Sequence, residues 1–248
     1  KPNFRTSPWK HQKRHRLRQN EDVKVDRSPA TQARSVATRE RIIDAAEGII
    51  VSEGIAACNT NAIAREAGIN VGTLYHHFND KLALYRAVVA DGMQWMQGIT
   101  GAIVADSTAP ETKIAAFIAA FVGLTEERPW MPAIMLREIA EGAPRLDLET
   151  MQHMRGIIGN FAAILAQGQQ QGVFRAIHPI LAYESVVGPI IINAARERVA
   201  AQPHRQGTDM PMLVSISNAD MLAHSQEAAR RMLAPTRSHL APVKESDS

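Results

Sequence analysis

Hydroxyl, amide, imidazole and ammonium groups gather in one short stretch of the chain, between positions 60 and 81. Hydroxyls, imidazoles and ammonium groups donate hydrogen bonds to phosphate oxygens, and an amide can pair with the edge of an adenine base. The polar side chains of this stretch are Thr60, Asn61, Thr73, Tyr75, His76, His77 and Lys81. Whether they can act together depends on the elements that carry them.

The residues between these polar groups have the spacing of a helix-turn-helix, in which two short helices cross steeply. Ala64 and Ala67 keep the crossing point small, and Gly68 tolerates the positive φ that the turn requires. Asn70 can cap the second helix by accepting from its free N–H groups. The apolar residues that would fill the space between the helices are Ile63, Ile69, Leu74 and Phe78.

The order Thr-Leu-Tyr-His-His-Phe-Asn-Asp-Lys, after Ile-Ala-Arg-Glu-Ala-Gly-Ile, resembles the DNA-binding signature of the TetR family of transcriptional regulators. The resemblance covers residues about 38–87. Beyond it, only the number and length of the helices are similar, and the basic N-terminal extension and the loop at 202–217 depart from the family pattern. The resemblance implies an all-α protein with an N-terminal three-helix DNA-binding domain and a larger helical domain for ligand binding and dimerisation.

The second helix of such a unit lies in the major groove with its N-terminal residues facing base edges. We therefore predict base contacts from Asn61, Val71, Gly72 and His76: Asn61 could pair with adenine, Val71 could touch a thymine methyl group, and Gly72 allows close approach. The predicted phosphate contacts are Thr60, Thr73, Tyr75, His77 and Lys81, and for the last four the resemblance implies the same role. Alternatively, Tyr75 packs in the core, His77 is solvated or buried, and Lys81 is an ordinary surface lysine.

Other chemistries have less support. A helix points His76 and His77 about 100° apart, so they cannot hold one ion together, and His11 and His15 lack a nearby carboxylate. Cys58 has no positive neighbour to lower its thiol pKa, so we expect a small buried residue there rather than a redox switch. The sequence contains no nucleophile elbow, phosphate-binding loop or zinc-protease motif. We expect no catalytic activity, no metal and no cofactor.

Composition places the chain among ordinary globular proteins. Its 248 residues are 45% hydrophobic and 21% charged, and no apolar run approaches the roughly 18 residues of a membrane span. A single cysteine suits a reducing compartment, and the basic N-terminus lacks the apolar run of a secretory signal. We therefore expect a cytoplasmic protein without membrane contact.

Positive charge is concentrated at the N-terminus. Residues 1–34 contain ten Lys and Arg but only three acidic residues, although the net charge of the chain is only +3. With almost no aliphatic side chains to bury, this segment is predicted to be a basic disordered arm. It either binds DNA phosphates or is a solvated tail.

Helical periodicity dominates from Thr38, a predicted N-cap, to about residue 233. The first helix is expected to end at Gly54. Gly188-Pro189 is expected to kink the helix at about 179–201. The expected helices lie at about 38–53, 60–67, 71–78, from 81 onward, 110–127, 132–141, 147–171, 179–201 and 219–233. The predicted parts are the arm 1–34, a DNA-binding domain 35–84, an effector-binding and dimerisation domain 85–235, and a disordered tail 236–248.

The last two helices carry apolar stripes suited to a four-helix bundle with a second subunit. The stripes consist of Leu181, Ile190, Ile191 and Ile192, and of Met221, Leu222, Ser225, Ala228, Ala229 and Met232. Alternatively, both stripes pack inside one chain. Methionines and aromatic residues earlier in this domain could line an effector pocket, or could simply fill the core. The pocket candidates are Met93, Met96, Phe117, Phe121, Trp130, Met135, Met154, Phe161 and Asn193, with Arg137 and Glu138 as further polar candidates.

These observations favour a homodimeric, ligand-responsive transcriptional regulator, a repressor that binds a palindromic operator and is released by a small-molecule effector. The alternative is a helical small-molecule carrier or enzyme with only non-specific affinity for DNA. Activation rather than repression would depend on the position of the operator, which no protein sequence contains. The sequence does not reveal the effector.

Overall fold

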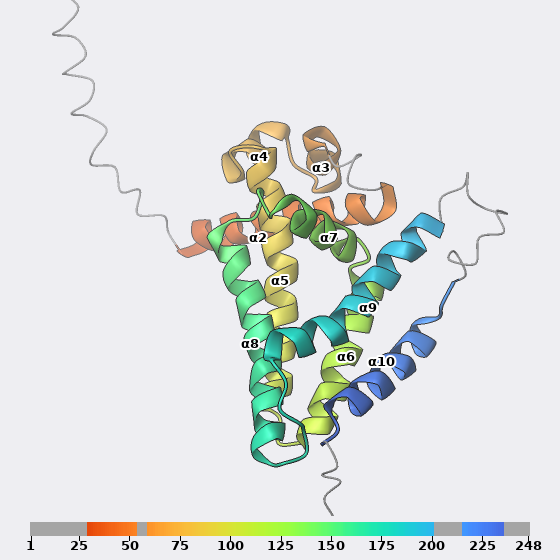
Figure 1. Ribbon diagram of the computed structural model, residues 1–248. Helices are drawn as coiled ribbons and strands as arrows, with labels where there is room; N and C mark the ends of the chain where they lie inside the picture. Colours follow the sequence, from red (N-terminus) through yellow and green to blue (C-terminus); the bar gives the residue numbers. More distant parts are fainter. Residues whose placement is uncertain (1–28, 54–58, 201–214, 236–248) are drawn as a thin grey trace, which may run out of the picture. The chain divides into compact units, whose positions relative to one another are not determined.

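The computed structural model describes residues 29–53, 59–200 and 215–235, and every regular element within these ranges is a helix (Figure 1). The predicted all-α fold is therefore confirmed for the described residues. The helices are α2 (Pro29–Glu53), α3 (Thr60–Glu66), α4 (Val71–His77), α5 (Lys81–Ala105), α6 (Pro110–Glu127), α7 (Met131–Glu141), α8 (Leu148–Gln170), α9 (Pro179–Ala200) and α10 (Asn218–Leu233).

The first described helix starts earlier than expected. Helix α2 begins at Pro29, and proline suits a helix start because it lacks an N–H group. Thr38 therefore lies inside the helix, where its Oγ1 donates to the carbonyl oxygen of Arg34 at 2.9 Å instead of capping. Residues 29–34 of the expected disordered arm are thus helical. The rest of the arm, Gly54, Cys58, most of the loop 202–217 and the tail 236–248 lie outside the described residues.

The packing described below is that of the compact unit that begins at Ile42. The stripe predicted on α2 faces its core, since Ile42, Ala46, Ile49 and Ile50 are all buried. The same core contains Ile63 of α3, Leu74 of α4 and Phe78. Helix α5 then runs unbroken across the boundary predicted between residues 84 and 85, so the two predicted domains share one helix.

Helix α5 packs along α8 and α6. Gly156 of α8 permits this close approach, because a Cβ there would lie 2.0 Å from Nε2 of Gln97 on α5. Lys113 of α6 is buried, and its ammonium group donates to the carbonyl oxygen of Val104 at 2.9 Å and to Oε1 of Gln167 at 3.1 Å. A positive charge at the C-terminal turn of α5 is stabilising, and it joins three helices.

The apolar stripe predicted on α10 divides between the core of the chain and its surface. Met221, Ser225 and Ala229 are buried because α10 lies against α6 and α9 (Figure 1), whereas Leu222 and Met232 are half-buried and Ala228 is exposed. Gln226 strengthens this contact by donating from Nε2 to the carbonyl oxygen of Ala115 at 3.0 Å. On α9, which continues across Pro189, the stripe divides: Ile190 is buried, whereas Leu181 and Ile192 are 58% and 61% exposed.

The membrane prediction can be checked only within the described ranges, where no helix combines the length and the apolar character needed to cross a bilayer.

Helix α7 is anchored by a carboxylate that has no exposed surface. Glu138 accepts hydrogen bonds from the hydroxyl of Tyr85 on α5 and from Nη1 of Arg145, both at 2.7 Å. Burial alone would raise the pKa of Glu138, but the hydrogen bonds from Tyr85 and Arg145 outweigh it and lower the pKa below its ordinary value. Burial raises the pKa of the Tyr85 hydroxyl, and its hydrogen bond to Glu138 raises that pKa further.

This arrangement predicts unequal roles for the two carboxylates that share Arg145. We expect Glu138→Ala to lower the free energy of unfolding by about 2–3 kcal/mol. The substitution leaves the Tyr85 hydroxyl and Nη1 of Arg145 without the carboxylate that accepts their hydrogen bonds. Glu141→Ala removes the solvent-exposed partner of the same Arg145 and should cost less than about 1 kcal/mol. Urea unfolding of both variants measures the difference, and equal losses would contradict the proposed importance of Glu138.

Candidate functional site

Three asparagine and aspartate caps shape the segment from α3 to α5. Asn59 accepts from the backbone N–H of Ala62 at 3.0 Å, Asn70 from that of Thr73 at 2.7 Å, and Asp80 from that of Ala83 at 2.7 Å. Each cap satisfies a backbone donor that the first turn of a helix leaves free. Between α3 and α4, Gly68 has a φ of +64°, the left-handed conformation that the predicted turn requires.

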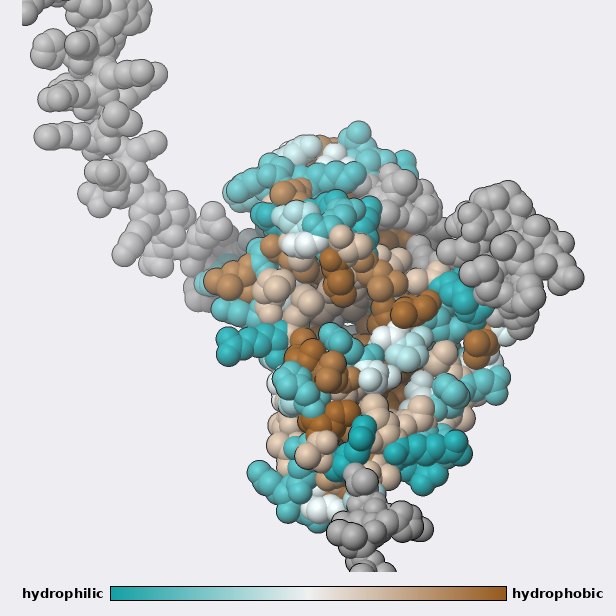
Figure 2. Space-filling model, viewed as in Figure 1, coloured by the Kyte–Doolittle hydropathy of each residue, from teal (hydrophilic) through white to brown (hydrophobic). Residues whose placement is uncertain are grey.

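The predicted contact residues lie mostly on the outside of the helix-turn-helix. Leu74 and Phe78 are buried, so the other sides of α4 face outward. Of the predicted base-facing residues, Asn61, Gly72 and His76 are exposed and Val71 is half-buried. Among the predicted phosphate contacts, Tyr75 and Lys81 are exposed, whereas Thr60, Thr73 and His77 are half-buried. Figure 2 shows hydrophilic surface over this part of the visible face.

Three of these side chains already have internal partners. The hydroxyl of Thr73 donates to Oδ1 of Asn70 at 3.1 Å, so a phosphate would have to compete for this proton. The rings of His76 and His77 meet edge to face, with their centroids 5.6 Å apart. Tyr75 is 48% exposed, which disfavours the alternative that it packs in the core. The described ranges contain no group of three or more His, Cys, Asp or Glu residues that could hold a metal ion.

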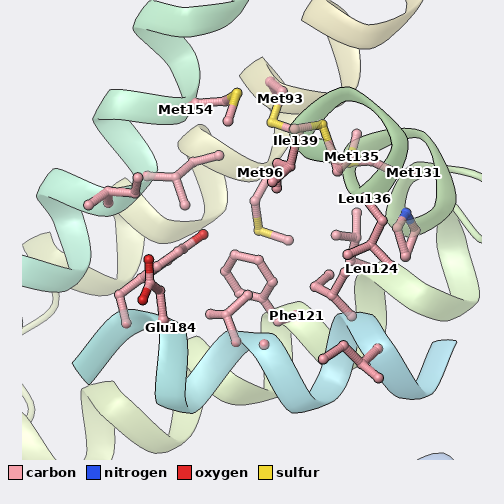
Figure 3. A pocket seen from close by; sticks show the side chains of 18 of the residues that line it. Met93, Met96, Phe121, Leu124, Met131, Met135, Leu136, Ile139, Met154 and Glu184 are labelled. Carbon is pink, nitrogen blue, oxygen red and sulfur yellow. The ribbon is translucent and has the colours of Figure 1, made fainter. Parts of the chain in front are cut away.

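A cavity of about 440 Å³ lies among α5, α6, α7, α8 and α9 (Figure 3). Five methionines contribute to its wall, and Figure 3 shows them together with Phe121 and Leu124. The lining residues are Met93, Met96, Phe121, Leu124, Met131, Pro132, Met135, Leu136, Ile139, Met154, Ile157, Ile158, Ile180, Tyr183, Glu184, Val187, Gly188, Ile191 and Ile192.

Five of the nine predicted pocket residues therefore line one cavity, namely Met93, Met96, Phe121, Met135 and Met154. The other four lie elsewhere. Phe117 and Phe161 are fully buried and meet each other with ring centroids 5.2 Å apart. Trp130 is buried beside Gly92, and its indole N–H has no acceptor among the described residues. Asn193 is buried and accepts from Arg196 at 2.8 Å.

The sequence interpretation missed the contributions of α9 to this cavity. Tyr183 and Val187 lie one helical turn apart on its first turns, Glu184 follows Tyr183, and Ile191 extends the row. Of these four residues, the sequence analysis named only Ile191, as part of the dimer stripe. The hydroxyl-bearing ring of Tyr183 packs against Phe117, Phe121 and Phe161, with centroid distances of 6.4, 6.2 and 5.7 Å, and burial raises the pKa of its hydroxyl.

The cavity wall is linked to α2 through Arg128, which lies just before α7. Its guanidinium forms ion pairs with Glu47 of α2 and, at 3.1 Å, with Asp91 of α5, and it lies 5.3 Å from the centroid of the Trp95 ring. Gly92 allows the start of α7 to approach α5, because a Cβ there would lie 1.9 Å from Cε of Met131. Helix α7 therefore lines the cavity, and Arg128 just before it holds α2 and α5.

Comparisons with known proteins agree with this geometry. The model of the bacterial regulatory proteins of the tetR family matches residues 42–88. The HTH-type transcriptional regulator SrpR of Pseudomonas putida is 45% identical over 60 residues, which are 24% of this chain and 28% of SrpR. The HTH-type transcriptional repressor KstR2 of Mycolicibacterium smegmatis is 30% identical over 95 residues, which are 38% of this chain and 46% of KstR2. The matched stretch is thus less than half of either relative.

A similar fold occurs over most of the chain in a solved structure. The crystal structure of the transcriptional regulator FadR from Bacillus subtilis, in complex with stearoyl-CoA, aligns with a TM-score of 0.60 and 18% identity. The alignment covers 80% of this chain and 99% of FadR. At this identity the likeness concerns the fold alone, an N-terminal helix-turn-helix domain followed by a larger helical domain.

The exposed positions of Tyr75 and Lys81 generate a prediction about DNA. We expect Tyr75→Ala and Lys81→Ala to weaken binding to specific and random duplexes alike, because both side chains are assigned to phosphates. Loss of the Lys81 charge should also lower the slope of log affinity against log salt by about one. Arg155→Ala, which removes an exposed positive charge from α8, is the matched control and should leave the slope unchanged. Salt titrations of fluorescence anisotropy measure these effects, and an unchanged slope for Lys81→Ala would contradict the assignment.

The link through Glu47 predicts a dependence of stability on pH. Burial raises the pKa of Glu47 to about 7, although Arg128 lowers it, and the carboxylates of Asp91 and Asp44 raise it further. Because this pKa is raised in the folded state, the group contributes stability that is present below its ordinary pKa and is lost as the pH rises through about 7.

From about pH 5 to pH 8, the free energy of unfolding of the unmodified protein should therefore fall by about 1–2 kcal/mol more than that of Glu47→Gln, which cannot titrate. Urea unfolding at both pH values measures the difference. Identical pH profiles for the two proteins would show that Glu47 does not titrate in this range.

Proposed function

We propose that this chain, which belongs to the TetR family of bacterial regulatory proteins, is a homodimeric transcriptional repressor released from a palindromic operator by a small molecule. The observation that carries this proposal is the exposed face of the helix-turn-helix, where the caps at Asn59, Asn70 and Asp80 hold α3, α4 and the start of α5 in register. The family match covers this same segment, residues 42–88.

The proposed reading surface combines two kinds of contact. Asn61, Val71, Gly72 and His76 supply base contacts, since the N-terminal part of the recognition helix faces the major groove. Thr60, Thr73, Tyr75, His77 and Lys81 surround them and bind phosphates, which sets the register of the protein on the duplex. A side chain at position 72 would separate α4 from the bases, and the glycine there avoids this.

The cavity is the proposed effector site, and helix α7 is the proposed connection to the DNA-binding helices. Met131, Met135 and Ile139 line the cavity at successive turns of α7. Arg128 and Glu138 hold the same helix to Glu47 of α2 and to Tyr85 of α5. An effector that displaces α7 would change both attachments, and it shifts the conformational equilibrium only as far as it binds the two states with different affinity.

Dimerisation is assigned to α9 and α10. The surface proposed on α9 is the exposed part of the stripe predicted there. Leu181 and Ile192 are more than half exposed and lie on one side of α9, where the exposed Ser185 between them is small enough for another helix to approach. A two-fold dimer through this face would present two reading helices to two half-sites, which a palindromic operator requires.

Selection from a random duplex library tests the proposal directly. The purified full chain is incubated with the library at moderate salt, and the retained DNA is sequenced. We expect an enriched palindrome whose half-sites are one or more helical turns apart. Retention without any sequence preference would overturn the regulator proposal and favour the alternative, a carrier or enzyme with only electrostatic affinity for DNA.

Variants of α9 test the dimer in the same assay. Leu181→Glu and Ile192→Glu place a charge on the proposed interface and should yield monomers in sedimentation, with affinity for the full palindrome reduced at least about tenfold. Gln152→Glu, at an exposed position of α8 and thus outside both helices, is a control for the added charge. Dimers that persist in both α9 variants would place the interface elsewhere.

A further inference from the structure

The cavity wall is almost entirely apolar and carries charge of one sign only. Of the nineteen lining residues, Glu184 is the only charged one, and none is Lys, Arg or His. Tyr183 supplies the only other polar side chain, and the remaining wall consists of methionine, proline, glycine, aliphatic residues and Phe121. The wall therefore offers one negative charge, at the edge of an otherwise apolar cavity.

In the part of the chain that the structure describes, no side chain neutralises Glu184. Among the described residues, no hydrogen bond or ion pair to its carboxylate is found, and the side chain is exposed at the edge of the cavity. In Figure 3 Glu184 rises from α9 at one edge of the group of labelled apolar side chains. Arg128, the cation that precedes α7, is already held by Glu47 and Asp91.

This pattern discriminates between ligands by charge. An anionic group inside the cavity would lose its hydration, find no positive partner in the wall, and be repelled by Glu184. A cation would be attracted to the same carboxylate. In addition, the faces of Phe121 and Tyr183 attract positive charge, and the five methionine thioethers adapt to an irregular apolar body.

The size of the cavity sets the scale of the ligand. Its volume of about 440 Å³ lies within the range of roughly 300–1,000 Å³ that is typical of sites for drug-sized molecules. A small inorganic or ammonium ion would leave most of the apolar wall without contacts. The ligand must therefore be large and mainly apolar.

We propose that the effector cavity selects lipophilic monocations, with the positive charge beside Glu184 and the apolar body against the methionine and aromatic side chains. This inference rests on the proposed function only for the regulatory consequence of binding. The selectivity itself is a property of the cavity, and it can be measured on the protein without DNA.

Two pairs of probes test the charge preference at constant shape. Tetraphenylphosphonium and tetraphenylborate have nearly the same size and surface but opposite charge, and dodecyltrimethylammonium and dodecyl sulfate, used well below their micelle concentrations, form an elongated pair. Isothermal titration calorimetry on the full chain should show that at least one cation binds, and binds at least about tenfold more tightly than its matched anion.

Glu184→Gln should reduce this preference severalfold, and because Glu184 is exposed, the exchange leaves the core intact. Glu149→Gln, which removes an exposed carboxylate of α8 outside the cavity, should leave the preference unchanged. The inference is overturned if neither cation binds, if an anion binds as tightly as its matched cation, or if Glu184→Gln keeps the full preference.

Release of the selected duplex by the bound cation, measured by anisotropy, separates this inference from the proposed function. A cation that binds through Glu184 without releasing DNA supports the ligand class and contradicts the effector role of the cavity. A duplex that is released only by a neutral apolar compound supports the effector role and overturns the ligand class.

Discussion

The carboxylate of Glu138 has no exposed surface, so neighbouring side chains must supply its hydrogen bonds. The arrangement of α5, α7 and the loop before α8 depends on these bonds. The carboxylate accepts from Tyr85 and Arg145, while Nε of Arg86 donates to the carbonyl oxygen of Arg145 at 2.8 Å. Two of these bonds, those donated by Tyr85 and Arg86, join segments more than fifty positions apart in the chain. They fix α7 at its C-terminal end, as Arg128 does at its N-terminal end, and only the middle of the helix is left to face the cavity.

The helix-turn-helix could be predicted almost completely because its determinants are local. The cap at Asn70, the left-handed turn at Gly68 and the buried Leu74 follow from residue type and from spacing within twenty positions, and the described structure has each of them. The DNA contacts of individual side chains remain predictions. Exposure shows that Asn61 or Tyr75 can reach a duplex, but not which of its atoms they contact.

The cavity and the burial of the apolar stripes were harder to predict because they depend on which helix covers which face. Phe117 and Phe121 lie one turn apart on α6, yet Phe161 covers the first while the second borders the cavity. Likewise, the stripe of Met221, Ser225 and Ala229 suits any close helical partner, and its own chain provides one in α6. Periodicity identifies an apolar face but does not identify its partner. Glu184 was missed for the same reason, because a single carboxylate on α9 looks like ordinary surface until the cavity beside it is known.

The continuity of α5 has a mechanical consequence. This helix has 25 residues and, at about 1.5 Å per residue, is about 37 Å long. Lys81 is its first residue, whereas Met93 and Met96 border the cavity near its middle. A rigid rod of this kind works as a lever: a tilt of about 5° around Met93 would carry Lys81, about 18 Å away, through about 1.5 Å. A displacement of that size is half the length of a hydrogen bond, so a rearrangement too small to disturb the core could still separate an ammonium group from a phosphate.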